Sequence, residues 1–524
     1  MPARAPATPG DAGWYAALLA RDARFDGRVF VGVTSTGIYC RPVCRVRTPL
    51  QRNCRFFAHA AAAESAGFRP CLRCRPELAP GLSLIDSPLA LAHQAARVID
   101  AAAAEGRELP MPAVAARLGV TDRHLRRIFG QALGVSPLAY LNTRRLLHAK
   151  ALLTDTPLSV TAIAHASGFG SLRRFNAAFA QHYRLSPSAL RQRGAPALAP
   201  SGSHGVSLTL GYRPPYDLAG MGRFLANRAL PGIEEVLIGE HGLTIRRSLA
   251  LTAEAQRHAG WIELALPVTR PEVRVQLSPG LIPVLGAVLQ RVRHALDLDA
   301  DPSLTEATLA DVASPAVPGL RLPGSFDSFE SAVRVILGQQ VTVAAARTLC
   351  RRLVEAFGEP ITTPHAGLDR LFPAAPRLAE ASADQLGRLG IVRQRVGALQ
   401  ALARAVAEGR IELHPAAPLE PTLQALRALP GIGEWTVQLI ALRVLGWPDA
   451  FAASDIGVLN ALGTRDPREA LARAEAWRPW RAYAVIRLWQ TLEKPTPEPQ
   501  PAISGSDGAP CARPPAARRR KPSP

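Results

Sequence analysis

The stretch that decides the fold is "LPGIGEWTVQLIALRVLGWPDAFAASDIGVL", residues 429–459. In it, Gly431 and Gly433 bracket one apolar residue, a pattern typical of a tight hairpin that leads into a helix. Backbone amides at such a hairpin, together with the helix dipole, can hold a DNA phosphate without reading sequence. Asp455 follows 24 residues after Gly431 and opens another helical segment. Its carboxylate is therefore a candidate helix cap.

A hairpin followed at this distance by an Asp resembles the helix-hairpin-helix DNA glycosylase superfamily. Three further stretches resemble the AlkA-type 3-methyladenine DNA glycosylases, namely "LGYRPPYDLAGMGRFLANRALPGIEEV" (210–236), "LRLPGSFDSFESAVRVILGQQVTVAAA" (320–346) and "EAWRPWRAYAVIRLWQ" (475–490). The resemblance spans about residues 206–492. It implies that Asp455 is catalytic and that Trp435 and Trp489 line the base pocket. It also implies DNA contacts, which we expect at Gly431, Gly433 and Gln340.

The residue two places after the second hairpin glycine predicts the reaction type. Bifunctional relatives carry a Lys there that forms a Schiff base, whereas this chain has Trp435. Without that amine we expect a monofunctional enzyme that makes no imine and cuts no strand. An alkylated purine is already cationic, so it leaves readily and stacks well on an indole face. The flipped base would enter the pocket while Asp455 stabilises the oxocarbenium charge or orients water. Trp477 and Tyr483 are further aromatic candidates for the pocket, although each is more often a core residue.

Two positions depart from the AlkA-type pattern. An apolar wedge usually follows Gly-Gln, but Gly338-Gln339 is followed here by Gln340. A second Asp usually precedes the catalytic one, and here that residue is Ser454. Base flipping and the range of accepted bases are therefore expected to differ. The Cys-x6-Cys-x2-Cys-x5-Cys pattern does not occur in the sequence, so we expect no iron–sulfur cluster.

Residues 110–193 contain a weak repeat with a spacing of about fifty residues. "VAARLGV" (114–120) is similar to "IAHASGF" (163–169), and Phe129 recurs as Phe179. The pattern predicts two helix-turn-helix units, and the region resembles the AraC-type DNA-binding domain. The expected recognition helices are residues 122–129 and 171–179. Expected core residues are Leu125, Ile128, Phe129, Phe175 and Phe179, and the expected DNA-facing residues are Arg123, His124, Arg126, Leu172, Arg173 and Asn176, for which a solvated surface is an equally good interpretation.

Four of the seven cysteines form two close pairs near the N-terminus. Their spacing, Cys-x3-Cys-x26-Cys-x2-Cys, is typical of a tetrahedral zinc site made by Cys40, Cys44, Cys71 and Cys74. A purely structural zinc is the common outcome of such a pattern. Residues 12–78, with "GRVFVGVTSTGIYCRPVCRVR" and "AGFRPCLRCRPE", resemble the zinc domain of the Ada family of alkylation-response proteins. The resemblance implies that Cys40 also accepts a methyl group from a DNA methylphosphotriester. It implies backbone contacts by Thr36, Arg45 and Arg73, whereas Cys54 is expected to be structural.

The charge balance predicts a polyanionic partner. The chain has 62 basic against 42 acidic residues, a net charge of +20, which favours nucleic acid. An apolar run long enough for a membrane span and a signal-peptide core are both missing from the sequence. We therefore expect a bacterial cytoplasmic, nucleoid-associated protein. The Pro-Cys-His-Arg nucleophile of the second Ada methyltransferase domain is also missing, so repair of O6-methylguanine is not expected.

These patterns together predict a mainly α, multidomain chain. The expected parts are a small zinc-bound α/β domain (1–82), an AraC-type double helix-turn-helix (83–194), a linker (195–204), an AlkA-like N-terminal α+β subdomain (205–316), an all-α helix-hairpin-helix glycosylase domain (317–493) and a disordered basic tail (494–524). The leading hypothesis is a monomeric Ada/AlkA fusion that excises alkylated purines and activates transcription after methyl transfer. Its expected partners are double-stranded DNA and RNA polymerase. The alternatives are an activator whose C-terminal half only binds damaged DNA, and a zinc DNA-binding protein in which Cys40 is structural.

Overall fold

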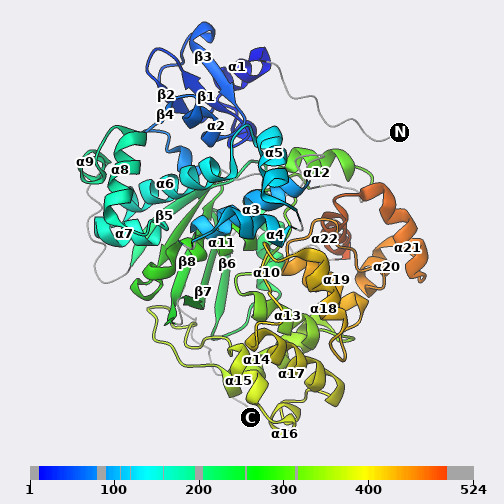
Figure 1. Cartoon of the computed structure of the whole chain (residues 1–524). Helices are drawn as coiled ribbons and strands as arrows, with labels where there is room; N and C mark the ends of the chain where they lie inside the picture. Colours follow the sequence, from blue (N-terminus) through cyan, green and yellow to red (C-terminus); the bar gives the residue numbers. More distant parts are fainter. Residues whose placement is uncertain are drawn as a thin grey trace, which may run out of the picture.

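The computed structural model describes residues 11–79, 90–312 and 317–492, apart from residues 105, 107, 119, 157, 195–204 and 254–255. The linker expected at 195–204 and the tail expected from 494 lie outside the described residues. In Figure 1 the chain runs from the blue N-terminal domain, through cyan helices and a green sheet, to the yellow and orange helices. Among the described helices there is none with the length and apolarity that crossing a membrane requires.

The N-terminal domain is a small four-stranded sheet with two short helices, which confirms the expected α/β architecture. Its strand order is β3-β1-β2-β4, and β2 and β4 run parallel with Tyr39 opposite Pro70. Cys40 is the last residue of β2, and Cys71 directly follows β4. Because the two strands run parallel, Cys40 and Cys71 meet at one edge of the sheet. The elements are α1 (Asp11–Ala20), β1 (Phe30–Val33), β2 (Ile38–Cys40), β3 (Cys54–Phe57), α2 (Ala60–Ser65) and β4 (Arg69–Pro70).

Seven helices follow in the described residues up to 194, and they form the predicted pair of helix-turn-helix units. The second helix of each unit begins at a hydroxyl cap, because Thr121 accepts a hydrogen bond from His124 N and Ser171 accepts one from Arg174 N. Phe129 and Phe179, the repeated pair, are both fully buried. The helices are α3 (Ala90–Ala104), α4 (Met111–Arg117), α5 (Asp122–Leu133), α6 (Pro137–Asp155), α7 (Val160–Ala166), α8 (Leu172–Tyr183) and α9 (Pro187–Gly194).

The C-terminal half begins with a five-stranded antiparallel sheet of order β5-β9-β8-β7-β6. Alternating burial along β5 matches its apolar-polar sequence, so one face of the sheet enters a core. The strands are β5 (Val206–Gly211), β6 (Glu234–Gly239), β7 (Gly242–Ala253), β8 (Gln256–Pro267) and β9 (Glu272–Leu277). The helices of this part are α10 (Leu218–Ala226), α11 (Leu285–Ala295) and α12 (Pro302–Thr308).

Residues 317–492 are helical, as the sequence predicts, and surround two apolar clusters. One cluster packs α13, α18, α19 and α22 together, and Phe224 of α10 joins it. The helix-hairpin-helix is α18, the turn at Gly431 and α19. The helices are α13 (Ser328–Leu337), α14 (Val343–Phe357), α15 (Ala375–Glu380), α16 (Ala383–Gly387), α17 (Arg393–Ala407), α18 (Leu419–Arg427), α19 (Glu434–Arg443), α20 (Ile456–Leu462), α21 (Pro467–Ala474) and α22 (Arg481–Leu492).

The helix-turn-helix region and the five-stranded sheet share one hydrophobic core. Phe175 and Phe179 of α8 belong to the same buried cluster as Leu264 of β8 and Val275 of β9. Helices α3 and α11 also approach closely, because a Cβ added at Gly286 would lie 1.6 Å from the carbonyl oxygen of Ala104. Only a glycine allows this backbone contact. The two halves of the chain are therefore packed against each other, not merely tethered.

Buried ion pairs attach the N-terminal domain to α6. Lys150 is 1% exposed and its Nζ lies 2.5 Å from Glu77 Oε2. The Arg75 guanidinium donates to Asp155 at 2.6 Å and to Glu77 at 2.9 Å. Because charges without partners are costly to bury, these pairs specify how the domain sits on α6.

A second buried carboxylate, Glu64, joins the N-terminal domain to two helices. It accepts hydrogen bonds from Tyr39 at 2.8 Å and from Thr143 of α6 at 2.5 Å. His182 Nε2 of α8 lies 2.8 Å from the same carboxylate. The residue before Cys40 is thus connected through one side chain to the second recognition helix.

Candidate functional sites

The four predicted cysteines meet in the N-terminal domain. Their sulfur atoms all lie within 4.8 Å of one another, and Cys40, Cys44 and Cys71 are buried. In the described part of the chain this is the one group of three or more metal-capable side chains. Tetrahedral Zn–S bonds of about 2.3 Å place sulfurs about 3.8 Å apart, which fits the cluster. A hydrogen bond from Cys40 lowers the pKa of the Cys44 thiol, which favours the deprotonated sulfur that binds a metal ion.

Polar side chains predicted to touch DNA surround this cluster at the surface. Thr36, Arg45 and Arg73 are all exposed. The buried Arg41 pairs with Asp26 and donates to the carbonyl oxygen of Cys74 at 3.1 Å, so it holds the loop that carries the cluster. Cys54 lies outside the cluster, on β3, with its thiol 3.4 Å from the carbonyl oxygen of Leu50.

The two expected recognition helices, α5 and α8, present different faces to the core and to the solvent. All five apolar residues assigned to the core are buried, with Leu125, Phe129, Phe175 and Phe179 at 0% exposure and Ile128 at 5%. Arg123, Arg173 and Asn176 are exposed, and His124 is partly exposed with its ring 3.2 Å from Arg127. Arg126 is exposed but pairs with Asp122 at 2.8 Å, which favours a surface role for it. Leu172 is partly exposed at the start of α8.

Asp455 is held by three hydrogen-bond donors. Its Oδ1 accepts from Trp489 Nε1 at 2.9 Å and from Val458 N at 3.0 Å. Its Oδ2 accepts from Trp435 Nε1 at 2.9 Å. The residue is 7% exposed and caps α20, so the helix-cap role is present together with a carboxylate held in a fixed position. The three residues predicted to form the reactive centre are therefore in contact with one another.

The hairpin and the loop after α13 form one surface. Gly431 has φ +75° and Gly433 caps α19, so the turn has the predicted geometry. Gln339 Nε2 donates to the carbonyl oxygen of Gly431 at 3.0 Å and to Thr436 at 2.9 Å. Next to it, Gln340 is exposed and adopts a left-handed backbone with φ +53°, which is uncommon for a residue other than glycine. Ser454 is exposed beside Asp455.

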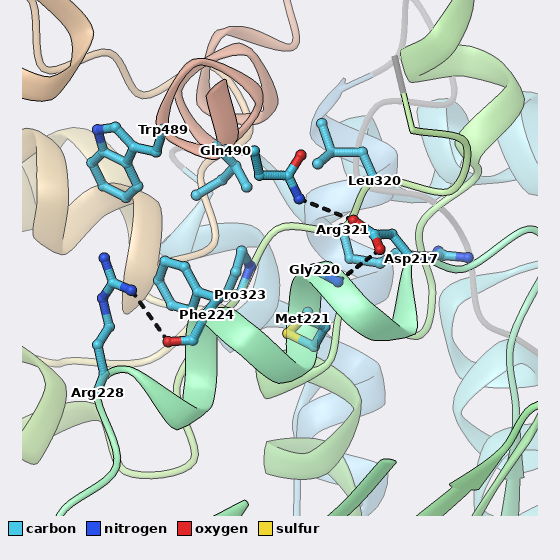
Figure 2. A pocket seen from close by; sticks show the side chains of 11 residues that line it. Asp217, Gly220, Met221, Phe224, Arg228, Leu320, Arg321, Pro323, Trp489 and Gln490 are labelled. Carbon is cyan, nitrogen blue, oxygen red and sulfur yellow. Dashed lines mark hydrogen bonds between the residues drawn. The ribbon is translucent and has the colours of Figure 1, made fainter. Parts of the chain in front are cut away.

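A pocket lies between α10 and α22, beside Asp455. Trp489 and Phe224 both line it, with ring centroids 6.5 Å apart and planes at 13°. Figure 2 shows Trp489, Phe224 and Arg228 at one end of the pocket and Asp217 with Gln490 at the other.

Sequence reasoning missed Phe224, Arg228 and the polar end of this pocket. Phe224 lies on α10, Arg228 lies just after it and Asp217 caps it, all more than 250 residues before Trp489, and the only available signal was the family-like stretch 210–236. Of the extra aromatic candidates, Tyr483 is 1% exposed and donates to Asp297 at 2.7 Å, so it is a core residue. Trp477 packs edge-on against Phe451 and does not line the pocket.

Comparison with protein families gives four matches in chain order. Residues 13–77 match the metal binding domain of Ada and residues 114–193 match a helix-turn-helix domain. Residues 207–327 match the AlkA N-terminal domain, and residues 333–481 match the HhH-GPD superfamily of base excision DNA repair proteins. Each match falls on a region with the corresponding fold described above.

Comparison with individual proteins shows relatives of the whole chain and of its parts. The chain is 39% identical over 496 residues to the probable bifunctional transcriptional activator/DNA repair enzyme AlkA of Mycobacterium tuberculosis, which covers 92% of this chain and 96% of that protein. It is 35% identical over 285 residues to DNA-3-methyladenine glycosylase 2 of Escherichia coli, covering 54% of this chain and 96% of that protein. It is 34% identical over 154 residues to the bifunctional transcriptional activator/DNA repair enzyme Ada of the same species, covering 29% of this chain and 41% of that protein.

Proposed function

Because this chain belongs to the family of bifunctional transcriptional activator/DNA repair enzymes AlkA, we propose that it hydrolyses the glycosidic bond of alkylated purines in DNA and couples this repair to a transcriptional response. The observation that carries the glycosylase part is the carboxylate of Asp455, fixed by two indole N–H groups, one of which belongs to Trp489 in the lining of the pocket. The weaker alternative, a C-terminal half that only binds damaged DNA, gives no reason for this arrangement.

In the proposed reaction the damaged base leaves the duplex and stacks between Phe224 and Trp489. The bond from the sugar C1′ to the base breaks, and its electron pair leaves with the base. A cationic purine thereby departs neutral, so no acid is needed at the base. The negative charge of Asp455 stabilises the positive charge that develops on the sugar. Water then adds to C1′ and loses a proton, which leaves an abasic site.

The indole at position 435 supports a monofunctional outcome. Trp435 donates to Asp455 at the place where bifunctional relatives carry an amine. An indole nitrogen cannot form an imine with the sugar. We therefore expect base release without strand cleavage. The test uses a duplex that contains 7-methylguanine. Release of the methylated base without strand cleavage supports the proposal, whereas strand cleavage in the absence of added alkali contradicts it.

The hairpin surface is proposed to hold the DNA around the flipped nucleotide. Amides of the turn at Gly431 and Gly433, at the start of α19, suit a backbone phosphate. Gln340 follows Gln339, which anchors the loop to the hairpin, and we propose that its side chain fills the vacated stack. We expect Gln340→Ala to lower base release from a paired site more than from a single-stranded one, because only the duplex must be opened.

Zinc is the metal that we propose for the four-cysteine cluster, because thiolate sulfurs in a tetrahedral group suit it. Zinc, when bound, keeps the sulfurs deprotonated. The Cys40 sulfur is proposed to attack the methyl carbon of a methylphosphotriester; the C–O bond breaks and an anionic phosphodiester leaves. Arg45, Arg73 and Thr36 would contact the DNA backbone around it. Mass spectrometry should find one added methyl, on Cys40, after incubation with methylated DNA, and a methyl on another cysteine would refute this role.

The helix-turn-helix pair is proposed to bind promoter DNA. Arg123 and His124 of α5 and Arg173 and Asn176 of α8 would lie in two successive major grooves. Methylation of Cys40 converts a thiolate to a thioether, which removes one negative charge near DNA phosphates and should raise affinity. RNA polymerase is the proposed partner of this activity. The protein is proposed to act in the cytoplasm, associated with the nucleoid, as a monomer. Sedimentation of the pure protein tests the monomeric state.

A further inference from the structure

The loop between α13 and α14 holds one residue in an uncommon backbone conformation. Gln340 has φ +53°, and among the described residues of 317–492 it is the one residue other than glycine with a left-handed backbone. A side chain is crowded in this conformation, so such a residue persists only where its surroundings hold it. Gln340 is exposed, and its side chain makes no hydrogen bond within the described residues. The contacts that hold it therefore come from its neighbours.

Gln339, the residue before it, is tied to the hairpin through its side chain. Its Nε2 donates to the carbonyl oxygen of Gly431 at 3.0 Å and to Thr436 Oγ1 at 2.9 Å, so both amide hydrogens are used. Thr436 is 2% exposed and belongs to the first turn of α19. Trp435, next to it, donates to Asp455. The loop after α13 and the reactive carboxylate are therefore anchored on the same helical turn.

Gln339 is also held through its main chain, by α17. The guanidinium of Arg395 donates to the carbonyl oxygen of the peptide group that joins Gln339 to Gln340. This bond fixes the peptide plane next to the φ rotation of Gln340. The following turn of α17 supports the hairpin, because a Cβ added at Gly431 would lie 3.0 Å from the Cβ of Ala398. Since α17 contributes buried residues to both apolar clusters of this region, it is a firm support for the loop and the hairpin.

We propose that Gln339 and Arg395 are positioning residues that keep Gln340, the side chain proposed to fill the vacated stack, in its left-handed conformation before DNA binds. A preformed loop loses little conformational freedom on entering the duplex, so more of the interaction with DNA is available to open the base pair. In a loose loop Gln340 would return to a more stable backbone conformation, and its Cα–Cβ bond would point in another direction. The inference rests on the proposed glycosylase function and on the proposed role of Gln340.

The test is a double-mutant cycle in the full-length protein. Gln339→Met keeps the length of the side chain but has no N–H donor, and Gln340→Ala removes the group that fills the stack. Single-turnover release of 7-methylguanine is measured from a duplex and from the corresponding single strand, for the unmodified protein, both single variants and the double variant. One hydrogen bond corresponds to roughly two- to ten-fold in the population of the conformation that it holds.

Because Gln339→Met breaks two hydrogen bonds, release from the duplex should fall about ten-fold. Release from the single strand, which has no base pair to open, should stay within about two-fold. If Gln339 acts through Gln340, the double variant should be at most about two-fold slower on the duplex than Gln340→Ala alone. The same cycle with Arg395→Ala in place of Gln339→Met should give the same pattern.

Two results overturn the inference. One is an additive loss, in which the double variant is slower than Gln340→Ala by a further factor of about ten, because the residue would then act by another route. The other is an equal loss on the duplex and on the single strand, because the residue would then support the fold or the reaction itself. Gln400→Met on α17 is the matched control. It loses a hydrogen bond of 2.7 Å from its amide to the carbonyl oxygen of Ala381, and duplex release should be unchanged.

Failure of the proposed function gives different results. If the unmodified protein releases no 7-methylguanine, the glycosylase proposal itself fails. If Gln340→Ala leaves duplex release unchanged, the proposed role of Gln340 fails, and the inference fails with it. Additive losses, in contrast, leave the proposed function intact and overturn only the positioning role of Gln339 and Arg395.

Discussion

Replacing Asp455 by Asn tests the reactive centre, and two separate effects are expected. The first is electrostatic. A carboxylate about 4 Å from a developing positive charge contributes about 4 kcal/mol at an effective dielectric constant of about 20. Asn removes this charge and keeps the size of the side chain. The rate of base release should therefore fall about 1000-fold.

The second effect is on stability and follows from the hydrogen bonds. The Asn oxygen can still accept from Trp489 and Val458, but its NH2 group then faces the Trp435 N–H. A donor without an acceptor costs about 1–3 kcal/mol of unfolding free energy. Adding Trp435→Phe removes the unpaired donor, so the double variant should recover stability and stay inactive.

Single-turnover release of 7-methylguanine measures the first effect, and urea unfolding followed by fluorescence measures the second. Binding to a duplex with an abasic-site analogue should stay within about three-fold of the unmodified protein, because hairpin contacts are unchanged. The reasoning is wrong if Asp455→Asn keeps more than a tenth of the rate. It is also wrong if adding Trp435→Phe restores the rate, since packing rather than charge would then explain the loss.

Three further outcomes are expected. Metal analysis should find one zinc per chain, and Cys71→Ser or chelation should remove it and make residues 11–79 sensitive to protease while base release stays within about two-fold. Glu77→Gln should cost about 3–5 kcal/mol of unfolding free energy, because it leaves the charge of Lys150 buried without its partner. As a control, Glu420→Gln breaks the exposed pair with Arg427 and should cost under about 1 kcal/mol. Burial lowers the pKa of His148 and of His294 to about 4, below the unfolded value of about 6.5. Between these two pH values the unfolded chain binds more protons than the folded chain. The free energy of unfolding should therefore decrease by about 3 kcal/mol per histidine as the pH falls from about 6.5 to about 4. Acid unfolding of His294→Gln should show a smaller decrease, and an unchanged pH dependence would contradict this assignment.

The parts of the sites that sequence predicted are those carried by short, local patterns. Cys40 and Cys71 belong to two close pairs whose spacing already requires one cluster, and Gly431 and Gly433 fix a turn through backbone conformation alone. Asp455 was predicted as both cap and reactive group, and its three donors accommodate both. For such residues the neighbours along the chain supply most of the information.

The parts that sequence missed depend on contacts between distant elements. Phe224 lies on an amphipathic helix and Arg228 just after its end, and helical periodicity shows that one face is buried without showing what covers it. Tyr483 shows the same limit, because an aromatic residue six positions before Trp489 could line the pocket, although such a residue is more often in the core, until its hydrogen bond to Asp297 is seen. The shared core of α8 with the sheet was not predicted, since both surfaces are simply apolar in the sequence.

That shared core changes what the connection between the halves does. The helix-turn-helix helices cover apolar strands of the glycosylase half, and Gly286 allows direct backbone contact with α3. If the chain were cut between residues 194 and 205, both fragments would keep this interface, and separating them would expose it to water. The buried interface, and not only the covalent connection between residues 194 and 205, thus holds the helix-turn-helix region and the glycosylase half together. A mutation that unfolds the helix-turn-helix region or the glycosylase half would consequently abolish both DNA binding by the helix-turn-helix pair and base excision.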